Sequence, residues 1–343
     1  MATENGDRKE ERFAVAAGSE LSVSNVSGRT TVKADDGSEI VVRYHRRGSK
    51  GLESAQVEVE KSGNRVSVQT RSKPTGLLNF SRSSPVEYDI SVPRDCAVSL
   101  HAVSAEISLE GTRGDTGIRT VSGKVRIANV AGDISVTSVS GDVEGRGLAG
   151  TFIGRSTSGD TSVLSSRLRR FSLNSVSGDF TIETPLVVDE QCNAKTVSGD
   201  LDLLLPAADG ATVQLRSVSG SVSCELPAEI IKSGRRHWQG RINGGGGHVE
   251  MNSVSGDLKV RVSRASGLGP SSETSSQAGS ASYKPSESNH ALSPSDFDVA
   301  AASGSRSDDA RDDPPASEPD IASVLAAVER GEISIEDAMI QIG

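Results

Sequence analysis

The chain has 343 residues, a formal net charge of −9 and an aromatic content of only 3%. Its apolar residues are mostly small or β-branched, which argues against one thick core and favours thin stacked layers of strands. No apolar run approaches the roughly 18 residues of a membrane span, and Met1–Glu10 lack the apolar core of a signal peptide. We therefore expect a cytoplasmic protein with at most an indirect association with membranes.

The first hundred residues divide into two parts. Residues 1–11 are strongly charged and are expected to be disordered. Residues 12–100 contain short alternating runs, for example Ile40-Val42-Tyr44, that predict strands. Between two such runs, Lys61-Ser62-Gly63-Asn64 predicts a hairpin turn. We expect this region to form a β-rich cap that begins the repeats following it.

Residues 101–264 are dominated by one repeated tripeptide. When the near copies Val103-Ser104-Ala105 and Thr157-Ser158-Gly159 are included, the central serines from Ser104 to Ser219 lie 18 to 21 residues apart, and the final step to Ser255 is 36, twice 18. Weaker copies lie halfway along the early steps, which indicates two strands and two corners in each turn of the chain. The period predicts an all-β fold, a flattened β-solenoid of about 18 to 21 residues per coil. The Val-Ser-Gly copies are Val26-Ser27-Gly28, Val121-Ser122-Gly123, Val139-Ser140-Gly141, Val176-Ser177-Gly178, Val197-Ser198-Gly199, Val218-Ser219-Gly220 and Val254-Ser255-Gly256.

Alternation within each repeat predicts the direction of its side chains. Valine and the glycine are expected to point inward, and the serine and the residue after the glycine outward. Stacked coils would then set outward carboxylates about 4.8 Å apart, in a row that could bind divalent cations. The sequence contains only fragments of the calcium-binding nonapeptide, and Lys124 and Ser221 interrupt the row. A role of the aspartates in stabilising turns or bulges is therefore favoured over a metal site. The expected row is Asp133, Asp142, Asp160, Asp179, Asp200 and Asp257.

The sequence offers little that suggests catalysis. Its five histidines show no metal-ligand spacing, its three cysteines form no Cys-x-x-Cys pair, and the run Asn243–His248 is followed by no lysine of a phosphate loop. We expect no enzymatic activity and no cofactor. The net negative charge of the chain lies beyond residue 264, and the nearly neutral region before it gives no general case for binding nucleic acid.

The C-terminal part changes character twice. Residues 265–319 have the Ser, Gly, Pro and Asp content of a disordered linker. Residues 320–343 predict a helical hairpin, with Asp320 and Ser334 as the N-caps and Gly331 as the stop between the helices. A hairpin this small cannot bury enough surface alone, so it is expected to self-associate, to bind a protein partner or to dock on the solenoid. Its candidate partner-binding residues are Val324, Leu325, Val328, Ile333, Ile335, Met339 and Ile342.

Three features together resemble the bacterial putative-adhesin family. They are the phrase Leu21–Gly28, the phrase Tyr88–Pro93 and the chain of Val-Ser-Gly-Asp repeats, which cover about residues 12 to 263. The tail also resembles the short helical hairpin that often accompanies this family. The resemblance implies a β-solenoid domain of unknown function with no established catalytic residues, a link to bacterial cell-envelope stress, and a hairpin used in oligomerisation or docking.

These observations favour a non-enzymatic scaffold in envelope-stress sensing or signalling, with a C-terminal hairpin that forms a homo-oligomer or recruits a protein. Two alternatives stay open. One is a surface adhesin or ligand-binding solenoid that uses the outward serines and aspartates. The other is a polymer of the bactofilin kind.

Overall fold

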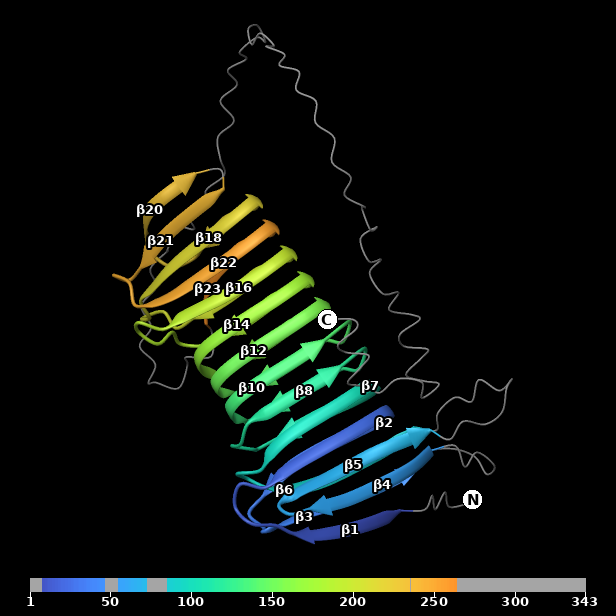
Figure 1. The fold of residues 1–343 in the computed structure, drawn as a ribbon. Helices are drawn as coiled ribbons and strands as arrows, with labels where there is room; N and C mark the ends of the chain where they lie inside the picture. The colour runs from blue at the N-terminus through green and yellow to red at the C-terminus, as the bar shows by residue number, and fades with distance from the viewer. Residues whose placement is uncertain (1–7, 47–54, 73–84, 235, 264–343) are drawn as a thin grey trace, which may run out of the picture.

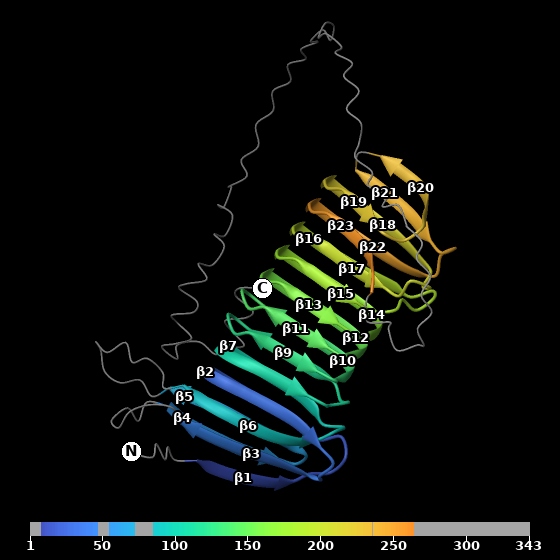
Figure 2. The same cartoon turned by 180° about the vertical axis from the view of Figure 1, so that it is seen from behind.

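The computed structural model describes residues 8–46, 55–72, 85–234 and 236–263, and their strands stack into one two-sided solenoid (Figures 1 and 2). The all-β solenoid that the repeat predicts is confirmed. Most neighbouring strands are parallel, and each regular coil contributes one strand to each of two faces. The predicted linker 265–319 and hairpin 320–343 lie outside the described residues.

The first face follows one spatial order from end to end. Its strands are β4 (Ala55–Ser62), β5 (Arg65–Ser72), the start of β2 (Glu20–Asp35), the start of β7 (Ala97–Glu110), β8 (Thr116–Thr120), β10 (Ala131–Ser138), β12 (Ala149–Ser158), β14 (Arg167–Ser177), β16 (Gln191–Ser198), β22 (Gly247–Ser255), β18 (Ala211–Ser219), β21 (His237–Ile242) and β20 (Ala228–Gly234).

The second face runs parallel to it, because β2 and β7 each turn a corner and continue there. Its strands are β1 (Lys9–Ala14), β3 (Glu39–Arg46), β6 (Val86–Pro93), the ends of β2 and β7, β9 (Val125–Ala128), β11 (Val143–Arg146), β13 (Thr161–Leu164), β15 (Phe180–Glu183), β17 (Leu201–Leu205), β23 (Leu258–Val262) and β19 (Val222–Cys224).

A narrow core fills the space between the faces. Alternate residues of each strand point into it, and Phe152 of β12 and Phe171 of β14, which are partners in the strand register, are fully buried. The small and β-branched composition fits this geometry, since two pleated faces leave room for one layer of side chains from each. The longer steps between repeats come from corner loops near Pro185 and Pro206, as predicted.

The coils do not stack in sequence order at either end. The last coil, β22 and β23, lies between β16–β17 and β18–β19, and the first coil, β2, lies between β5–β6 and β7 (Figure 1). The 36-residue step does not consist of two ordinary coils, because it contains the β20–β21 hairpin and the return to an inserted coil. Antiparallel strands cover the parallel stack at both ends of the first face and at the β1 end of the second face, where unpaired edges would invite aggregation. At the other end of the second face, β19 is the last strand that the structure describes.

Two expectations for the N-terminal region have different outcomes. The hairpin turn is confirmed, because Ser62 pairs with Arg65 and Gly63 has a φ of 60°. Disorder throughout residues 1–11 is wrong, because β1 begins at Lys9 and pairs with β3. The Arg43 guanidinium donates to Glu10 at 2.8 Å, so the charges that suggested disorder help to hold this strand.

Candidate functional site

One long edge of the solenoid is built from the repeated tripeptides, and we call it the Val-Ser-Gly edge. At this edge each coil of the chain passes from its strand on the first face to its strand on the second face. The glycines lie one above another, so a Cβ added to Gly141 would come within 2.2 Å of the Gly123 carbonyl oxygen, and one added to Gly199 within 2.2 Å of the Gly178 carbonyl oxygen. Glycine is therefore required by close packing of coils, as its inward parity indicated.

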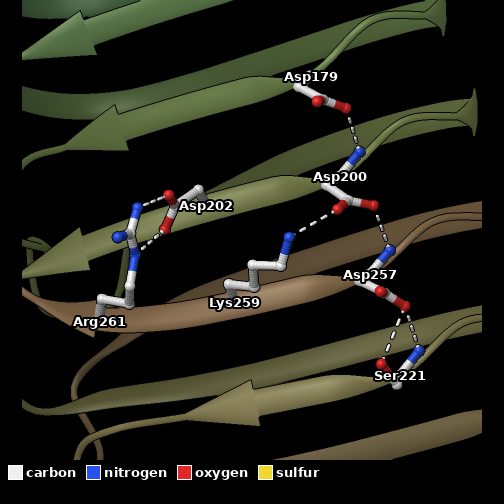
Figure 3. Close-up of polar contacts among 7 residues, drawn as sticks. All are labelled: Asp179, Asp200, Asp202, Ser221, Asp257, Lys259 and Arg261. Carbon is white, nitrogen blue, oxygen red and sulfur yellow. Dashed lines mark hydrogen bonds and ion pairs between the residues drawn. The ribbon is translucent and has the colours of Figure 1, made fainter.

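Next to the glycines, aspartates form a continuous hydrogen-bonded ladder (Figure 3). The Asp179 carboxylate accepts the backbone N–H of Asp200 at 2.9 Å, and the Asp200 carboxylate accepts that of Asp257 at 2.9 Å. The same contact joins Asp142 to Asp160, Asp160 to Asp179 and Asp257 to Ser221. Each carboxylate thus accepts a hydrogen bond from a backbone N–H of the neighbouring coil. The aspartates are therefore explained by a structural role at the corners of the coils.

The structure brings five of the six predicted carboxylates together. Asp133 is not among them, because it belongs to the half-step copy at the opposite corner and pairs in register with Thr151. An aspartate directly after a glycine occurs at both corners of the coil, so this sequence pattern alone could not show which corner Asp133 occupies. No group of three or more His, Cys, Asp or Glu side chains within the described ranges has the arrangement of a metal site.

Cations from the last coil reinforce the ladder. Lys259 donates to the second oxygen of Asp200 at 2.8 Å, and Arg261 bonds the Asp202 carboxylate through Nε at 2.7 Å (Figure 3). Partial burial opposes ionisation of Asp200, but the hydrogen bond from Lys259, the backbone N–H of Asp257 and the charge of Lys259 together lower its pKa. The hydrogen bond that Lys259 donates to Asp200 raises the pKa of Lys259. The inserted coil is therefore tied to its neighbour by charge as well as by backbone.

A shallow depression of about 600 Å³ lies over this end of the Val-Ser-Gly edge. Serines, glycines and aspartates of the last four coils line it, among them Ser198, Asp200, Ser219 and Asp257. Its lining offers hydroxyl and carboxylate oxygens, so it suits a polar ligand that donates hydrogen bonds.

The valines of the edge contradict the expected inward direction over half of its length. Val26, Val103, Val121 and Val139 are buried, whereas Val176, Val197, Val254 and Val218 are 51%, 49%, 51% and 57% exposed. These four lie on β14, β16, β22 and β18, which are consecutive in space. We call the four side chains the valine ridge. Neighbouring strands are about 4.8 Å apart, so the ridge is about 14 Å long.

A change in the position of the bend explains the reversal. After β8 and β10 the chain bends at the valine itself, so that Thr120 and Val121 are both buried. In the later coils the strand continues through the serine, and strict alternation after the buried Ser175 turns Val176 outward. Because the tripeptide is the same in both halves, nothing within it predicts the ridge.

Other predicted groups are inert or lie elsewhere. Cys96 and Cys192 are free and buried, and burial raises the pKa of both thiols. No membrane-spanning helix is present in the part of the chain that the structure describes. The candidate partner-binding residues Val324 to Ile342 of the hairpin lie outside the described residues, so their role stays a prediction.

Comparison with known proteins gives a family and several structural likenesses. The family model described as Toastrack DUF4097 matches residues 19–261. A structure titled as a putative adhesin from Bacteroides fragilis is 16% identical with a TM-score of 0.42, covering 75% of this chain and 97% of that chain. One titled as a putative adhesin from Parabacteroides distasonis is 10% identical with a TM-score of 0.32, covering 75% and 98%. One titled as a putative cell adhesion protein from Clostridium sporogenes is 11% identical with a TM-score of 0.25, covering 75% and 100%. No curated protein matches.

Proposed function

We propose that this chain, which belongs to the Toastrack DUF4097 family, is a non-enzymatic binding solenoid that contacts another protein chain through the valine ridge. One observation carries the proposal: four valines about half exposed stand in a row on consecutive coils, where the same tripeptide buries its valine in earlier coils. Burying apolar surface contributes roughly 25 cal/mol per Å², so a straight apolar row on a rigid support is a favourable contact surface.

Site-specific photocrosslinking in cells tests this function. A benzophenone amino acid in place of Val197 is expected to yield a covalent adduct with a protein. Val188 is the matched control, since it is an equally apolar valine, 65% exposed, in the loop at the opposite corner. If position 197 gives no more protein adduct than position 188, the ridge is not a protein-contact surface.

A second candidate is a surface adhesin or ligand-binding solenoid. The depression lined by Ser198, Ser219 and Asp257 favours it, because hydroxyls and carboxylates on a rigid edge can bind sugar hydroxyls. Binding of the purified protein to an immobilised glycan panel, lost on replacing Ser219 with a bulkier leucine, would support this candidate. Absence of binding to every glycan would count against it.

We also propose that this protein acts in sensing or signalling stress of the bacterial cell envelope. The family resemblance and the amphipathic pattern of residues 321–342 support this role. A deletion strain is expected to be more sensitive to membrane-active compounds. Complementation by the chain that ends at residue 319 separates the hairpin from the solenoid. If this shortened chain restores full resistance, the hairpin has no part in the response.

A further inference from the structure

Two rows of polar side chains flank the valine ridge, one on each face. They run over the four ridge coils and over β12, where Thr157 occupies the position of the valine. Two residues before each of these positions lies a hydrogen-bond donor, and we call these residues the donor row: Arg155, Asn174, Lys195, Asn252 and Arg216. Three residues after each position lies the aspartate row: Asp160, Asp179, Asp200 and Asp257, which ends at Ser221.

The donor row is positively charged. Among the described residues, Arg155 and Lys195 are exposed and have neither an ion pair nor a side-chain hydrogen bond. Arg216 is paired with Glu250, so it adds little net charge. Beyond Arg216 lie two further exposed cations and a histidine whose pKa is lowered by desolvation: Arg236, Lys232 and His237.

The aspartate row keeps its negative charge although its members accept hydrogen bonds. Each carboxylate accepts the backbone N–H of the next coil through Oδ1 (Figure 3). Lys259 binds Oδ2 of Asp200. Within the described ranges, the Oδ2 atoms of the other three accept no hydrogen bond: Asp160, Asp179 and Asp257. The valine ridge therefore lies between a positive row and a negative row.

We propose that two copies of this chain associate ridge to ridge about a two-fold axis parallel to the long axis of the solenoid. This axis sets equal coils opposite each other and exchanges the faces, so that the donor row of each copy meets the aspartate row of the other. The facing pairs are Arg155 with Asp160, Asn174 with Asp179, Lys195 with Asp200, Asn252 with Asp257 and Arg216 with Ser221.

Charge selects this arrangement over the other symmetric one. A two-fold axis perpendicular to the solenoid axis would set donor row against donor row and aspartate row against aspartate row, and like charges in contact oppose association. In the parallel arrangement Lys195 meets Asp200, which Lys259 already neutralises, but Asp179 and Asp257 lie one coil spacing away on either side. Their unbonded oxygens are available to it.

The valines supply the attraction and the two rows set the orientation. Eight half-exposed valines lose contact with water when the ridges meet. The ridge is only about 14 Å long, so the interface is smaller than the standard size for stable complexes. We expect a weak dimer with a Kd on the order of 10 μM. This inference rests on the proposed function and names the partner of the ridge as a second copy.

Sedimentation equilibrium of the purified full chain tests the dimer. With rising concentration the wild type is expected to approach twice 35.6 kDa. Val→Thr at all four ridge positions is expected to raise Kd at least about tenfold, and so is Arg155→Glu with Lys195→Glu. The control Arg167→Glu with Arg170→Glu makes the same change of charge at the opposite corner of β14 and is expected to leave Kd unchanged. Circular dichroism checks that every variant is folded.

Cross-linking with a bismaleimide shorter than the ridge tests the orientation. Val176 and Val218 lie at opposite ends of the ridge. In the proposed dimer Val176→Cys and Val218→Cys each cross-link to the same position of the second copy. In a dimer with opposed axes, position 176 instead meets position 218, so a mixture of the two variants gives mainly mixed dimers. That result overturns the proposal. The wild-type chain measures the background from the native cysteines.

The photocrosslink at position 197 separates failure of the dimer from failure of the proposed function. An adduct with a second copy, mapped by mass spectrometry to the valine ridge, supports the dimer. An adduct with a different protein overturns the dimer and leaves the proposed function standing. An adduct within one molecule overturns both. A wild type that stays monomeric up to its solubility limit, or a Val→Thr variant with unchanged Kd, also overturns the dimer.

Discussion

Replacing Gly199 with alanine tests whether the stack of corner glycines sets the spacing of the coils. The added Cβ would lie 2.2 Å from the carbonyl oxygen of Gly178 and 3.0 Å from its carbon. Relief requires a shift of nearly 1 Å in a coil held by the bond from Phe180 N–H to the Asp200 carbonyl at 2.8 Å and by the contact of Asp200 N–H with Asp179 at 2.9 Å. Overpacking strain together with two weakened hydrogen bonds predicts a loss of about 3 kcal/mol.

Urea denaturation measures this loss, followed by far-ultraviolet circular dichroism and by the fluorescence of Trp238, the only tryptophan. Coincidence of the two transitions would justify a single free energy of unfolding. Gly117→Ala is the matched control, because nothing lies within 4 Å of its added Cβ. It is expected to be neutral or to stabilise by about 0.5 kcal/mol. A difference between the two variants below about 0.5 kcal/mol would refute the packing argument.

Three further predictions concern other parts of the solenoid. Asp200 has a lowered pKa in the folded state, so its ionisation stabilises the protein above the ordinary value near 4, and this contribution is lost as pH falls through the lower folded value. Asp200→Asn should therefore reduce the urea midpoint more at pH 7 than at pH 2, and equal reductions would contradict this. Ending the chain after Asn243 removes the inserted coil and should expose Trp238 with a red-shifted emission, whereas ending it after Ser263 should not; an unshifted spectrum would argue against the inserted order. Asn25→Ala leaves the buried Val86 carbonyl without its side-chain donor at 3.1 Å and should cost about 1–3 kcal/mol in urea unfolding. The control Asn193→Ala removes a partly buried side chain that, among the described residues, accepts a bond only from the exposed Gln191, and it should change the free energy of unfolding little.

Local pattern carried the prediction of the coils. Alternation around Val121 and Phe180 gives strands whose inward residues are buried, and the 18-residue step gives two strands and two corners. The inward glycine of each repeat correctly predicted a crowded corner, because parity and the absence of a side chain are both visible in the sequence. These features depend on residues that are close in sequence within one coil, so the repeated sequence is enough to predict them.

The candidate site was less accessible. The valine ridge exists because the chain bends after the serine in the later coils, which turns the valine outward, and at the valine in earlier coils. The tripeptide is identical in both, so its sequence does not predict where the bend lies. Asp133 matches the pattern of the ladder but belongs to the other corner.

The sequence by itself determined that this chain is an all-β solenoid with Val-Ser-Gly corners, because periods of two and of 18 to 21 residues are local properties. Only the tertiary structure decided that the first and last coils are inserted rather than terminal. The physical reason is that any parallel coil of matching length can pair with any other. Which coils become neighbours depends on how the ends of the stack are covered, and that choice also sets four valines side by side.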